Sequence, residues 1–419
     1  MSGIAEMPKA RPTGSDSIRA GMPPLTSSTS DVRCVGFLLR RVDCNDGVAS
    51  HCETLMRGLR EAGIKVILIT GPVSFDEKTR ARHDALASLA EIWVKPEVDG
   101  AWAFNLKAAR EISRAVRDHK IDLLHLHGIS SLPLARLAGF RVHVPLVVTA
   151  HPSGTSSTGP RGLTRAAIRC LAPLLRRTVL PDRAIAISSE LRDWFVSEIH
   201  MSPSRVARIF NGVDDAHFRP PNEWERSEAR RALGVGDSEF VCSLVGRYEP
   251  VKGHDVLCDA ARQLNPDSRG MRIFFVGGGD DHLIRTVIAQ RNVEEVVEMR
   301  GYVDDLRAIY WASDVIALPS RREGFGLVIA EAMLCGTVPL RTPSGGAYDQ
   351  ITHGVDGYIF PFEDAAALAA HLQTLRADRP LCREMGERAC RTARARFSAR
   401  AMVENTIKLY RTAVMEHQS

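Results

Sequence analysis

Residues 315–336 read VIALPSRREGFGLVIAEAMLCG, and this stretch decides the fold class of the 419-residue chain. An apolar strand ends near Leu318, a polar loop follows at residues 319–326, and a helix is predicted from Leu327 to Leu334. A short buried strand that leads directly into a helix is the repeating unit of a parallel sheet. Ligands of such sheets bind at the turn between strand and helix.

The same alternation of short apolar runs and longer helical patterns continues through both halves of the chain. The first half has predicted strands at Val35–Leu39, Val66–Thr70, Leu123–His127, Leu146–Thr149 and Ala184–Ile187. The second half has them at Phe240–Leu244, Ile273–Val276, Val296–Met299, Val315–Leu318, Val338–Leu340 and Tyr358–Phe360. Between the halves, Pro220 and Pro221 favour an extended connector. We therefore expect an α/β protein with two parallel sheets and a boundary at 219–222.

Composition and charge fit a folded globular protein of two domains. Hydrophobic residues make up 44% and charged residues 25% of the chain, the balance of a globular protein, and no apolar run approaches the roughly 20 residues of a membrane span. Residues 1–30 are rich in Pro, Ser and Thr and predict a disordered arm. The nine cysteines have no regular spacing, which favours a reducing cytoplasm over a disulfide framework.

The net charge of +5 arises in the N-terminal half, and part of it lies in residues 161–183. Arginines alternate there with leucines in an amphipathic pattern. We favour a helix that packs on a sheet and turns a basic face to solvent. The alternative is peripheral contact with the inner face of a membrane, or with an anionic acceptor. Nucleic acid is disfavoured because no stacking aromatics accompany the basic residues.

The loop and helix after residue 318 carry the residues best suited to a nucleotide sugar. Gly324 and Gly326 allow a ligand close to the backbone, and the amino end of a helix attracts a diphosphate. Glu331 lies within an apolar helical run, where a carboxylate needs a partner, and it can accept two vicinal hydroxyls of a ribose. Glu323, on the loop, is placed to face the sugar.

Two cations follow the first strand of the second half. Residues 241–253 read VCSLVGRYEPVKG, with Arg247 and Lys252 on the turn after the strand. Positive charge at this position can neutralise a leaving diphosphate, which is the main electrostatic requirement for breaking a glycosyl-phosphate bond. Taken alone, the two residues are better interpreted as exposed surface cations, but their place after the first strand of a domain favours a role in binding.

Together these motifs resemble the retaining GT-B glycosyltransferases of family 4. Glu323 and Glu331 are similar to the family's E-x7-E pair, and GRYEPVKG is similar to its diphosphate loop. Three further segments match in order: VVTAHPSG at 147–154, FNGVDDAHF at 210–218 and SGGAYDQITHGVDGYIF at 344–360. The resemblance spans about residues 33–412.

The resemblance implies two Rossmann-like domains that face each other across a cleft. Residues 31–218 would form the acceptor-side domain and residues 219–398 the donor-binding domain, with a last helix at about 399–415 packing back on the first domain. Backbone groups of Gly324, Phe325, Gly326 and Leu327 would contact the donor. Arg247 and Lys252 would bind its diphosphate, and His151 would line the reaction centre with Glu323.

The loop before the first helix departs from the family pattern of two consecutive glycines. This chain has Asn45-Asp46-Gly47, so that Gly47 retains the second glycine position while Asp46 adds a negative charge. Gly47 is therefore expected near the donor, and Asp46 is a candidate contact to the acceptor. We also place His127 and Asn211 on the acceptor side.

A metal site is not indicated. His125 and His127 lie on one face of a strand, but no companion ligand stands near them in sequence. The chain contains no Asp-x-Asp motif, which favours metal-independent chemistry without a cofactor. The glycines at 277–279 lack the spacing of a dinucleotide fingerprint and predict a tight turn.

We therefore expect a retaining transfer of a hexose from a nucleotide diphosphate donor to an acceptor hydroxyl. One alternative is a GT-B enzyme of other chemistry, a nucleotide-sugar epimerase or a sugar phosphorylase. Another is a non-catalytic subunit that binds a nucleotide sugar, an interpretation that the altered loop at Asp46 favours. The base, the sugar and the acceptor are not encoded in any of these motifs.

Overall fold

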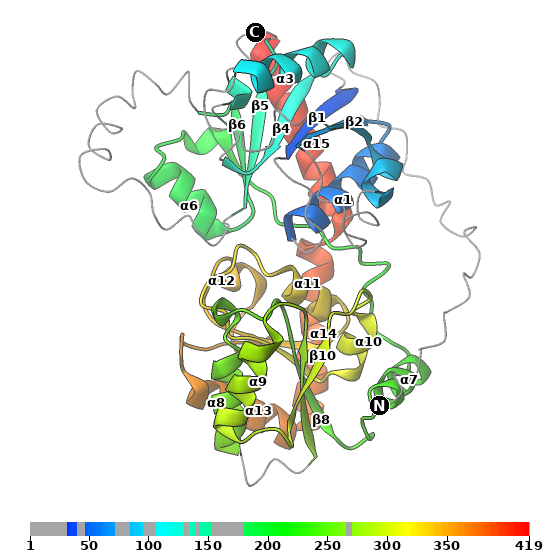
Figure 1. Ribbon diagram of the computed structural model, residues 1–419, viewed down its shortest axis with the longest axis vertical. Coiled ribbons are helices and arrows are strands. Elements are labelled where there is room, and N and C mark those ends of the chain that lie inside the picture. Colours follow the sequence, from blue (N-terminus) through cyan, green and yellow to red (C-terminus); the bar gives the residue numbers. More distant parts are fainter. Residues whose placement is uncertain are drawn as a thin grey trace. The chain divides into compact units, whose positions relative to one another are not determined.

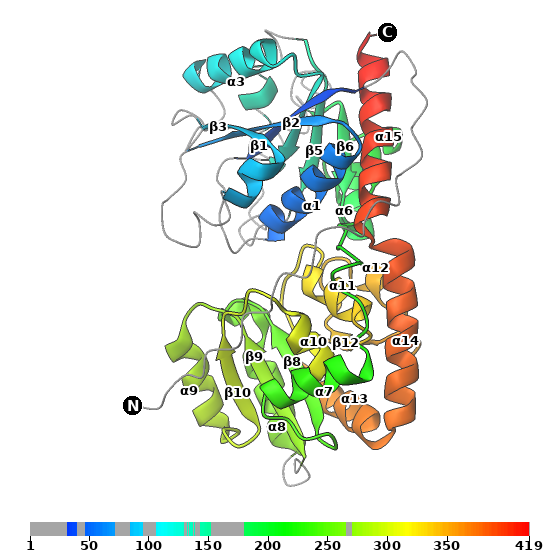
Figure 2. The ribbon, with the colours of Figure 1, turned by 90° about the vertical axis from the view of Figure 1, so that its right-hand side faces the viewer.

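The computed structural model describes residues 32–39, 47–71, 84–94, 106–129, 132, 134–136, 138, 143–151, 180–264 and 270–418. Within these residues the chain forms two parallel sheets, one in each half (Figures 1 and 2). The prediction of an α/β fold with two Rossmann-like sheets is confirmed. The predicted arm at 1–30 and most of the basic segment 161–183 lie outside the described residues.

The first sheet has seven strands in the order β3-β2-β1-β4-β5-β6-β7, and every neighbouring pair is parallel. The strands are β1 (Cys34–Leu39), β2 (Lys65–Thr70), β3 (Glu91–Val94), β4 (Leu123–His127), β5 (Leu146–Ala150), β6 (Arg183–Ala186) and β7 (Val206–Arg208). The chain moves outward from β1 to one edge and then returns to add β4 on its other side. The pair β1 and β4 is therefore the topological switch point of this sheet.

Helices cover both faces of the first sheet. They are α1 (Gly47–Glu61), α3 (Leu106–Asp118), α6 (Ser189–Ser197) and α15 (Ala399–Gln418). Side chains of α3 and α6 share an apolar core with one face, while α1 and α15 share a core with the other. The last helix, α15, packs on α1 and contributes Met402, Ile407 and Tyr410 to the core of this first sheet (Figure 2).

The second sheet repeats the topology with six strands in the order β10-β9-β8-β11-β12-β13, all parallel. They are β8 (Phe240–Val245), β9 (Met271–Val276), β10 (Val297–Gly301), β11 (Val315–Leu318), β12 (Val338–Arg341) and β13 (Tyr358–Ile359). The switch point here lies between β8 and β11. These two strands precede the two segments in which the sequence predicts the donor site.

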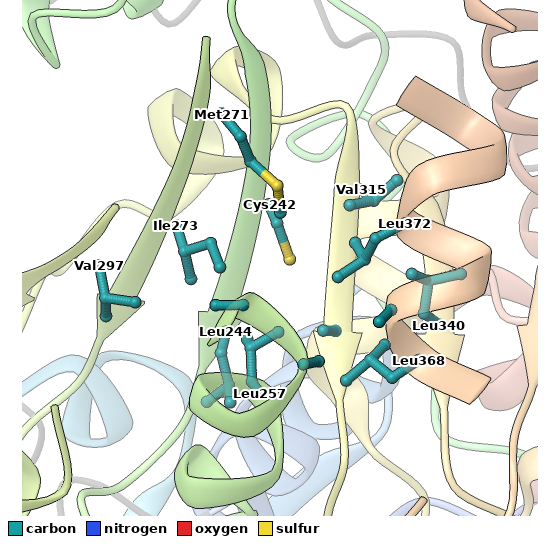
Figure 3. Close-up of a cluster of buried hydrophobic side chains, with 14 of the residues drawn as sticks. Cys242, Leu244, Leu257, Met271, Ile273, Val297, Val315, Leu340, Leu368 and Leu372 are labelled. Carbon is teal, nitrogen blue, oxygen red and sulfur yellow. The ribbon is translucent and has the colours of Figure 1, made fainter. Parts of the chain in front are cut away.

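Two layers of helix enclose the second sheet. The helices are α7 (Glu223–Ala232), α8 (His254–Leu264), α9 (Asp281–Arg291), α10 (Arg307–Ala312), α11 (Leu327–Leu334), α12 (Ala347–Gln350), α13 (Ala365–Ala377) and α14 (Arg379–Arg396). Figure 3 shows the core beneath α8 and α13, where Leu257 and Leu372 meet Leu244 and Val315 of the sheet. Side chains of α10, α11 and α14 pack with the other face.

Two strands of the first sheet have no counterpart in the sequence prediction. Both β3 and β7 are edge strands, and their side chains are only partly buried. An edge strand with one covered face does not need the continuous apolar run that identifies a central parallel strand. None of the described helices has the length and apolar composition that a membrane span requires.

Candidate active site

The predicted donor residues gather at the switch point of the second sheet. β8 pairs with β11, and the segments that follow them carry Arg247 and Lys252 in one case and Glu323 to Gly326 in the other. Because both strands are parallel, their carboxyl ends open at the same edge. The fold therefore brings together two motifs that lie about seventy residues apart in the chain.

An ion pair between Lys252 and Glu323 links the two motifs. The lysine Nζ lies 2.6 Å from the glutamate Oε1, and the side chains are only 19% and 10% exposed. Lys252 ends a short 3-10 turn, Pro250–Lys252, and its alkyl chain crosses Gly246, where a Cβ would lie 3.4 Å from the lysine Cδ. An ordered, partly desolvated lysine at this edge is suited to bind an anion.

Arg247 takes a different position. Its side chain is 61% exposed and pairs with Glu249 at 2.9 Å. An exposed pair of this kind contributes little to stability, so the guanidinium is free to turn toward a ligand at small cost. The structure thus holds Lys252 in place and leaves Arg247 on the surface.

Helix α11 begins at the glycine-rich loop, as the sequence predicts. Gly326 caps it with φ of 79°, a left-handed conformation that disfavours other residues. Phe325 has its side chain in the core, so it offers a ligand only its backbone. Gly324 and Leu327 flank this turn and are partly exposed. The amino end of α11 therefore presents backbone and helix dipole at the carboxyl edge of β11.

Arg341, which the sequence analysis did not single out, ties this loop to the following one. Its side chain is fully buried and donates to the carbonyl of Phe325 at 3.0 Å and to those of Ser344 and Gly345 at 2.6 and 3.1 Å. It also donates to the Gln350 side chain, whose amide nitrogen in turn donates to the Gly326 carbonyl. Burial lowers the pKa of Arg341 to about 10, so it remains a cation at neutral pH.

The loop that Arg341 holds also requires glycine at position 345. A Cβ on Gly345 would lie 2.0 Å from the carbonyl oxygen of Glu323. The two loops are therefore in contact through their backbones, and the buried Arg341 guanidinium holds them together by hydrogen bonds to carbonyls of both loops. An arginine that ends an apolar strand four positions before two consecutive glycines is the sequence signal for this arrangement.

Glu331 lies on α11 with one oxygen bound. Its Oε2 accepts a hydrogen bond from the Tyr310 hydroxyl at 2.8 Å. Burial raises the pKa of Glu331 to about 7, and the bond from Tyr310 opposes this in part. The prediction of a carboxylate within the helix is confirmed, but its partner Tyr310 on α10 was not foreseen. One carboxylate oxygen remains to accept hydroxyls from a ligand.

The first sheet places histidines at the edge that corresponds to the donor edge of the second sheet. His127 ends β4, His151 follows β5, and His51 lies on the buried side of α1. Burial lowers the pKa of all three, that of His151 to about 3, so the imidazoles are neutral at pH 7. His51 was not among the predicted site residues, and it lies among the buried residues of α1.

The two histidines of β4 have different environments. His125 is fully buried, and its two ring nitrogens bond to the hydroxyls of Tyr410 at 2.6 Å and Thr149 at 2.7 Å. Both ring nitrogens of His127 are buried and have no hydrogen-bond partner among the described residues. His125 is therefore a structural residue of the core, whereas His127 is available to a ligand.

Three further predicted residues belong to the first half of the chain. Asn211 is buried beside His51, and its Oδ1 has no partner among the described residues. Gly47 is exposed and opens α1. Asp46 lies outside the described residues. The structure thus groups Asn211 with the histidines.

Solved structures, one of them named as a glycosyltransferase, share this fold over nearly their whole length. Anabaena Alr3699/HepE in complex with UDP matches with a TM-score of 0.75 at 21% identity, over 90% of this chain and 98% of that one. A glycosyltransferase from Rickettsia africae ESF-5 matches with a TM-score of 0.76 at 17% identity, over 92% and 99%. The chain therefore has the GT-B fold, the class that two Rossmann-like sheets define.

Sequence comparison narrows the class to one family. Residues 225–392 match the model of Glycosyl transferases group 1, and residues 45–217 match that of Glycosyltransferase Family 4. D-inositol 3-phosphate glycosyltransferase of Salinispora arenicola is 31% identical over 88% of this chain and 87% of its own length. The same enzyme of Geodermatophilus obscurus is 28% identical over 88% and 85%.

The chain belongs to glycosyltransferase family 4. It is a retaining glycosyltransferase that uses a nucleotide sugar, as the resemblance of its motifs implied.

Proposed function

We propose that the donor is a UDP-hexose held at the carboxyl edge of the second sheet. The observation that carries the proposal is the ordered pair of Lys252 and Glu323 at the switch point between β8 and β11. Lys252 and Arg247 would bind the diphosphate together with the backbone of Gly324 to Leu327. Solved relatives of the same fold support the choice of base, since HepE is described in complex with UDP and with UDP-glucose.

The two glutamates have separate tasks in this proposal. Glu331 would accept the ribose hydroxyls through the oxygen that Tyr310 leaves free. Glu323 would turn toward the hydroxyls of the sugar once the diphosphate takes over its contact with Lys252. The ion pair would therefore keep both side chains in position before the donor binds, which reduces the rearrangement of these side chains on binding.

In the reaction, the bond between the anomeric carbon and the phosphate oxygen breaks and UDP leaves with the bonding electrons. The acceptor oxygen forms a new bond to the anomeric carbon on the same face, so that the configuration is retained. The leaving phosphate oxygen takes the acceptor proton. Lys252, Arg247 and the amino end of α11 would stabilise the charge that develops on the diphosphate.

The acceptor would bind on the first sheet, and residues 31–218 would form the acceptor-side domain with the helix of residues 399–415. Gly47, Asp46, His127 and Asn211 would line this side, with His151 at the reaction centre. The family relatives named above act, by their names, on D-inositol 3-phosphate. A small phosphorylated polyol is accordingly our proposed acceptor class. Residues 219–398 would form the donor domain.

A cytoplasmic location belongs to the same proposal. The described cysteines are buried free thiols, as expected of a protein kept in a reducing compartment. Peripheral contact through residues 161–183 would bring the enzyme to the inner face of a membrane. Fractionation of cells that express the full chain, with and without alkaline or high-salt washing, would separate a soluble enzyme from a peripheral one.

Thermal shift with a panel of UDP-, GDP-, ADP- and TDP-sugars tests the donor. We expect one class, the UDP-sugars, to raise the melting temperature, and Lys252→Ala and Glu331→Ala to remove this effect. Stabilisation by a different base would contradict the choice of UDP. No stabilisation by any donor would favour a non-catalytic subunit.

Product analysis tests the reaction. UDP release that requires an acceptor such as D-inositol 3-phosphate, with NMR of the early product showing the anomeric configuration of the donor, is the expected result. Release of a sugar phosphate would indicate a phosphorylase, and conversion of the donor without an acceptor would indicate an epimerase. An inverted anomer would contradict the proposed same-face attack.

A further inference from the structure

Three histidines from separate elements converge at the carboxyl edge of the first sheet. They are His51 on α1, His127 at the end of β4 and His151 directly after β5. Their ring centroids lie 5.4 Å apart for the first two, 4.9 Å for His51 and His151, and 5.8 Å for His127 and His151. The ring nitrogens that can act as ligands all lie within 4.8 Å of one another.

Most ring nitrogens of this group have no hydrogen-bond partner in the part of the chain that the structure describes. Both ring nitrogens of His127 and the Nε2 of His151 are buried without a hydrogen bond, and those of His51 lie beside the Asn211 side chain without hydrogen-bond geometry. Leaving a buried polar atom without a hydrogen bond destabilises the folded protein. His125, two positions before His127 on β4, shows the alternative, because both of its ring nitrogens bond to hydroxyls. The three-histidine group therefore has the free nitrogens of a ligand site.

The spacing of the rings fits coordination of one ion. A tetrahedral metal with nitrogen ligands at about 2.0–2.1 Å holds its imidazole centroids roughly 5 Å apart. The observed distances between ring centroids, 4.9–5.8 Å, bracket this value. The three imidazole rings therefore need only rotate and move slightly toward one another to bind one ion. His51 and His127 are almost fully buried, while His151 is partly exposed and gives access from solvent.

We propose that His51, His127 and His151 bind one divalent transition-metal ion, of the kind represented by Zn²⁺ and Co²⁺. Three neutral imidazoles suit borderline metals and disfavour Mg²⁺ and Ca²⁺, which prefer oxygen ligands. Water completes the fourth position on the side of His151. His127 has no companion ligand near it in sequence, and the two imidazoles beside it come from α1 and from the residue that follows β5.

Metal binding at this place has a consequence for transfer, and this consequence rests on the proposed function. His151 is the residue that we place at the reaction centre, and an ion bound to it removes its imidazole from substrate. Zn²⁺ is therefore expected to inhibit the enzyme. Metal binding is measured without nucleotide or acceptor. A protein that binds no metal would therefore contradict the metal site alone and leave the proposed transfer reaction unaffected.

Titration of chelator-treated, full-length protein with Co²⁺ is the test. Four-coordinate Co²⁺ absorbs in the visible range, and we expect the band to saturate at one equivalent. His51→Ala and His127→Ala should each weaken binding at least about tenfold. His254→Ala is the matched control and should bind Co²⁺ as the wild type does. His254 is also buried, and its ring nitrogens have no hydrogen-bond partner among the described residues, but it lies on α8, which packs on the second sheet.

The outcome is decisive even where a variant folds poorly. Circular dichroism shows which variants are folded, and X-ray absorption of the wild-type cobalt complex counts imidazole ligands without any substitution. Three imidazoles are expected. The proposal would be overturned by the absence of a saturable band or by fewer than three imidazole ligands. Wild-type affinity for Co²⁺ in folded His51→Ala and His127→Ala would overturn it as well.

Discussion

The two sheets share one topology, but the polar side chains at their switch points differ in whether they have partners within the protein. At the second sheet, Lys252 pairs with Glu323, and Arg341 bonds to the carbonyls of both neighbouring loops. At the first sheet, His51 and His127 hold buried nitrogens without partners among the described residues. The proposed donor edge is therefore pre-organised by the protein's own groups, whereas the edge of the first sheet keeps ring nitrogens that a ligand could bind.

Removal of the ordered cation should have the largest effect. We expect Lys252→Ala to lower kcat about 10²–10³-fold, because the leaving diphosphate loses a fixed positive charge and Glu323 loses the group that aligns it. Lys408→Ala is the control, a lysine on the exposed side of α15, and it should leave kcat unchanged. Steady-state kinetics with UDP-sugar and acceptor measure both. A loss of less than tenfold in Lys252→Ala would mean that the pair does not prepare the donor edge.

Arg341→Met tests the buried guanidinium that fixes the donor loops. The substitution keeps the volume roughly but leaves several buried carbonyls without a donor, so we expect the free energy of unfolding to fall by about 3 kcal/mol. Arg341→Lys should recover part of this. Urea denaturation gives the values, and Arg262→Met on the exposed side of α8 should change stability by under about 0.5 kcal/mol. Equal stability of Arg341→Met and wild type would show that the loops hold without the arginine.

The protonation of Glu331 should make donor affinity depend on pH. Burial raises the pKa of this acid to about 7, so the carboxylate that accepts ribose hydroxyls is mostly neutral at pH 6 and mostly ionised at pH 8. Affinity for UDP should therefore rise about tenfold between these values and level off above them. Calorimetry measures it. In Glu331→Gln the affinity should be lower and flat with pH; a wild-type profile that is also flat would contradict the role of this residue.

The satisfied histidine of the first sheet should give the smallest effect. Tyr410→Phe removes one hydrogen bond from His125 and leaves a buried nitrogen unpaired, which costs about 1–2 kcal/mol of stability. His127→Leu removes nitrogens that have no partner among the described residues, so stability should change less or rise. Thermal melts of the two variants compare a structural histidine with one reserved for a ligand. The reverse order would mean that His127 has a structural partner.

Much of the fold follows from local pattern. The central strands of both sheets are continuous apolar runs, and the predicted helix from Leu327 to Leu334 begins and ends as the structure has it. The last helix also begins at Ala399 as expected and continues to Gln418. These elements are predictable because parallel strands buried on both faces and helices with glycine stops leave strong signals.

The residues that sequence reasoning missed are those whose partners lie far away in the chain. Tyr310 bonds to Glu331 across 21 positions, and Arg341 reaches back to Phe325 across 16. His51 reads as one more residue of an amphipathic helix until β4 and β5 bring two imidazoles beside it. Only the three-dimensional structure shows which partners these polar side chains contact.

The most direct measurement is the structure of the full chain with UDP bound. We expect the diphosphate to lie within hydrogen-bond distance of Lys252 and of the backbone at the amino end of α11. The ribose hydroxyls should donate hydrogen bonds to the Glu331 carboxylate. UDP bound at the edge of the first sheet, or at the second sheet without contact to Lys252 and Glu331, would contradict the assignment of the donor site.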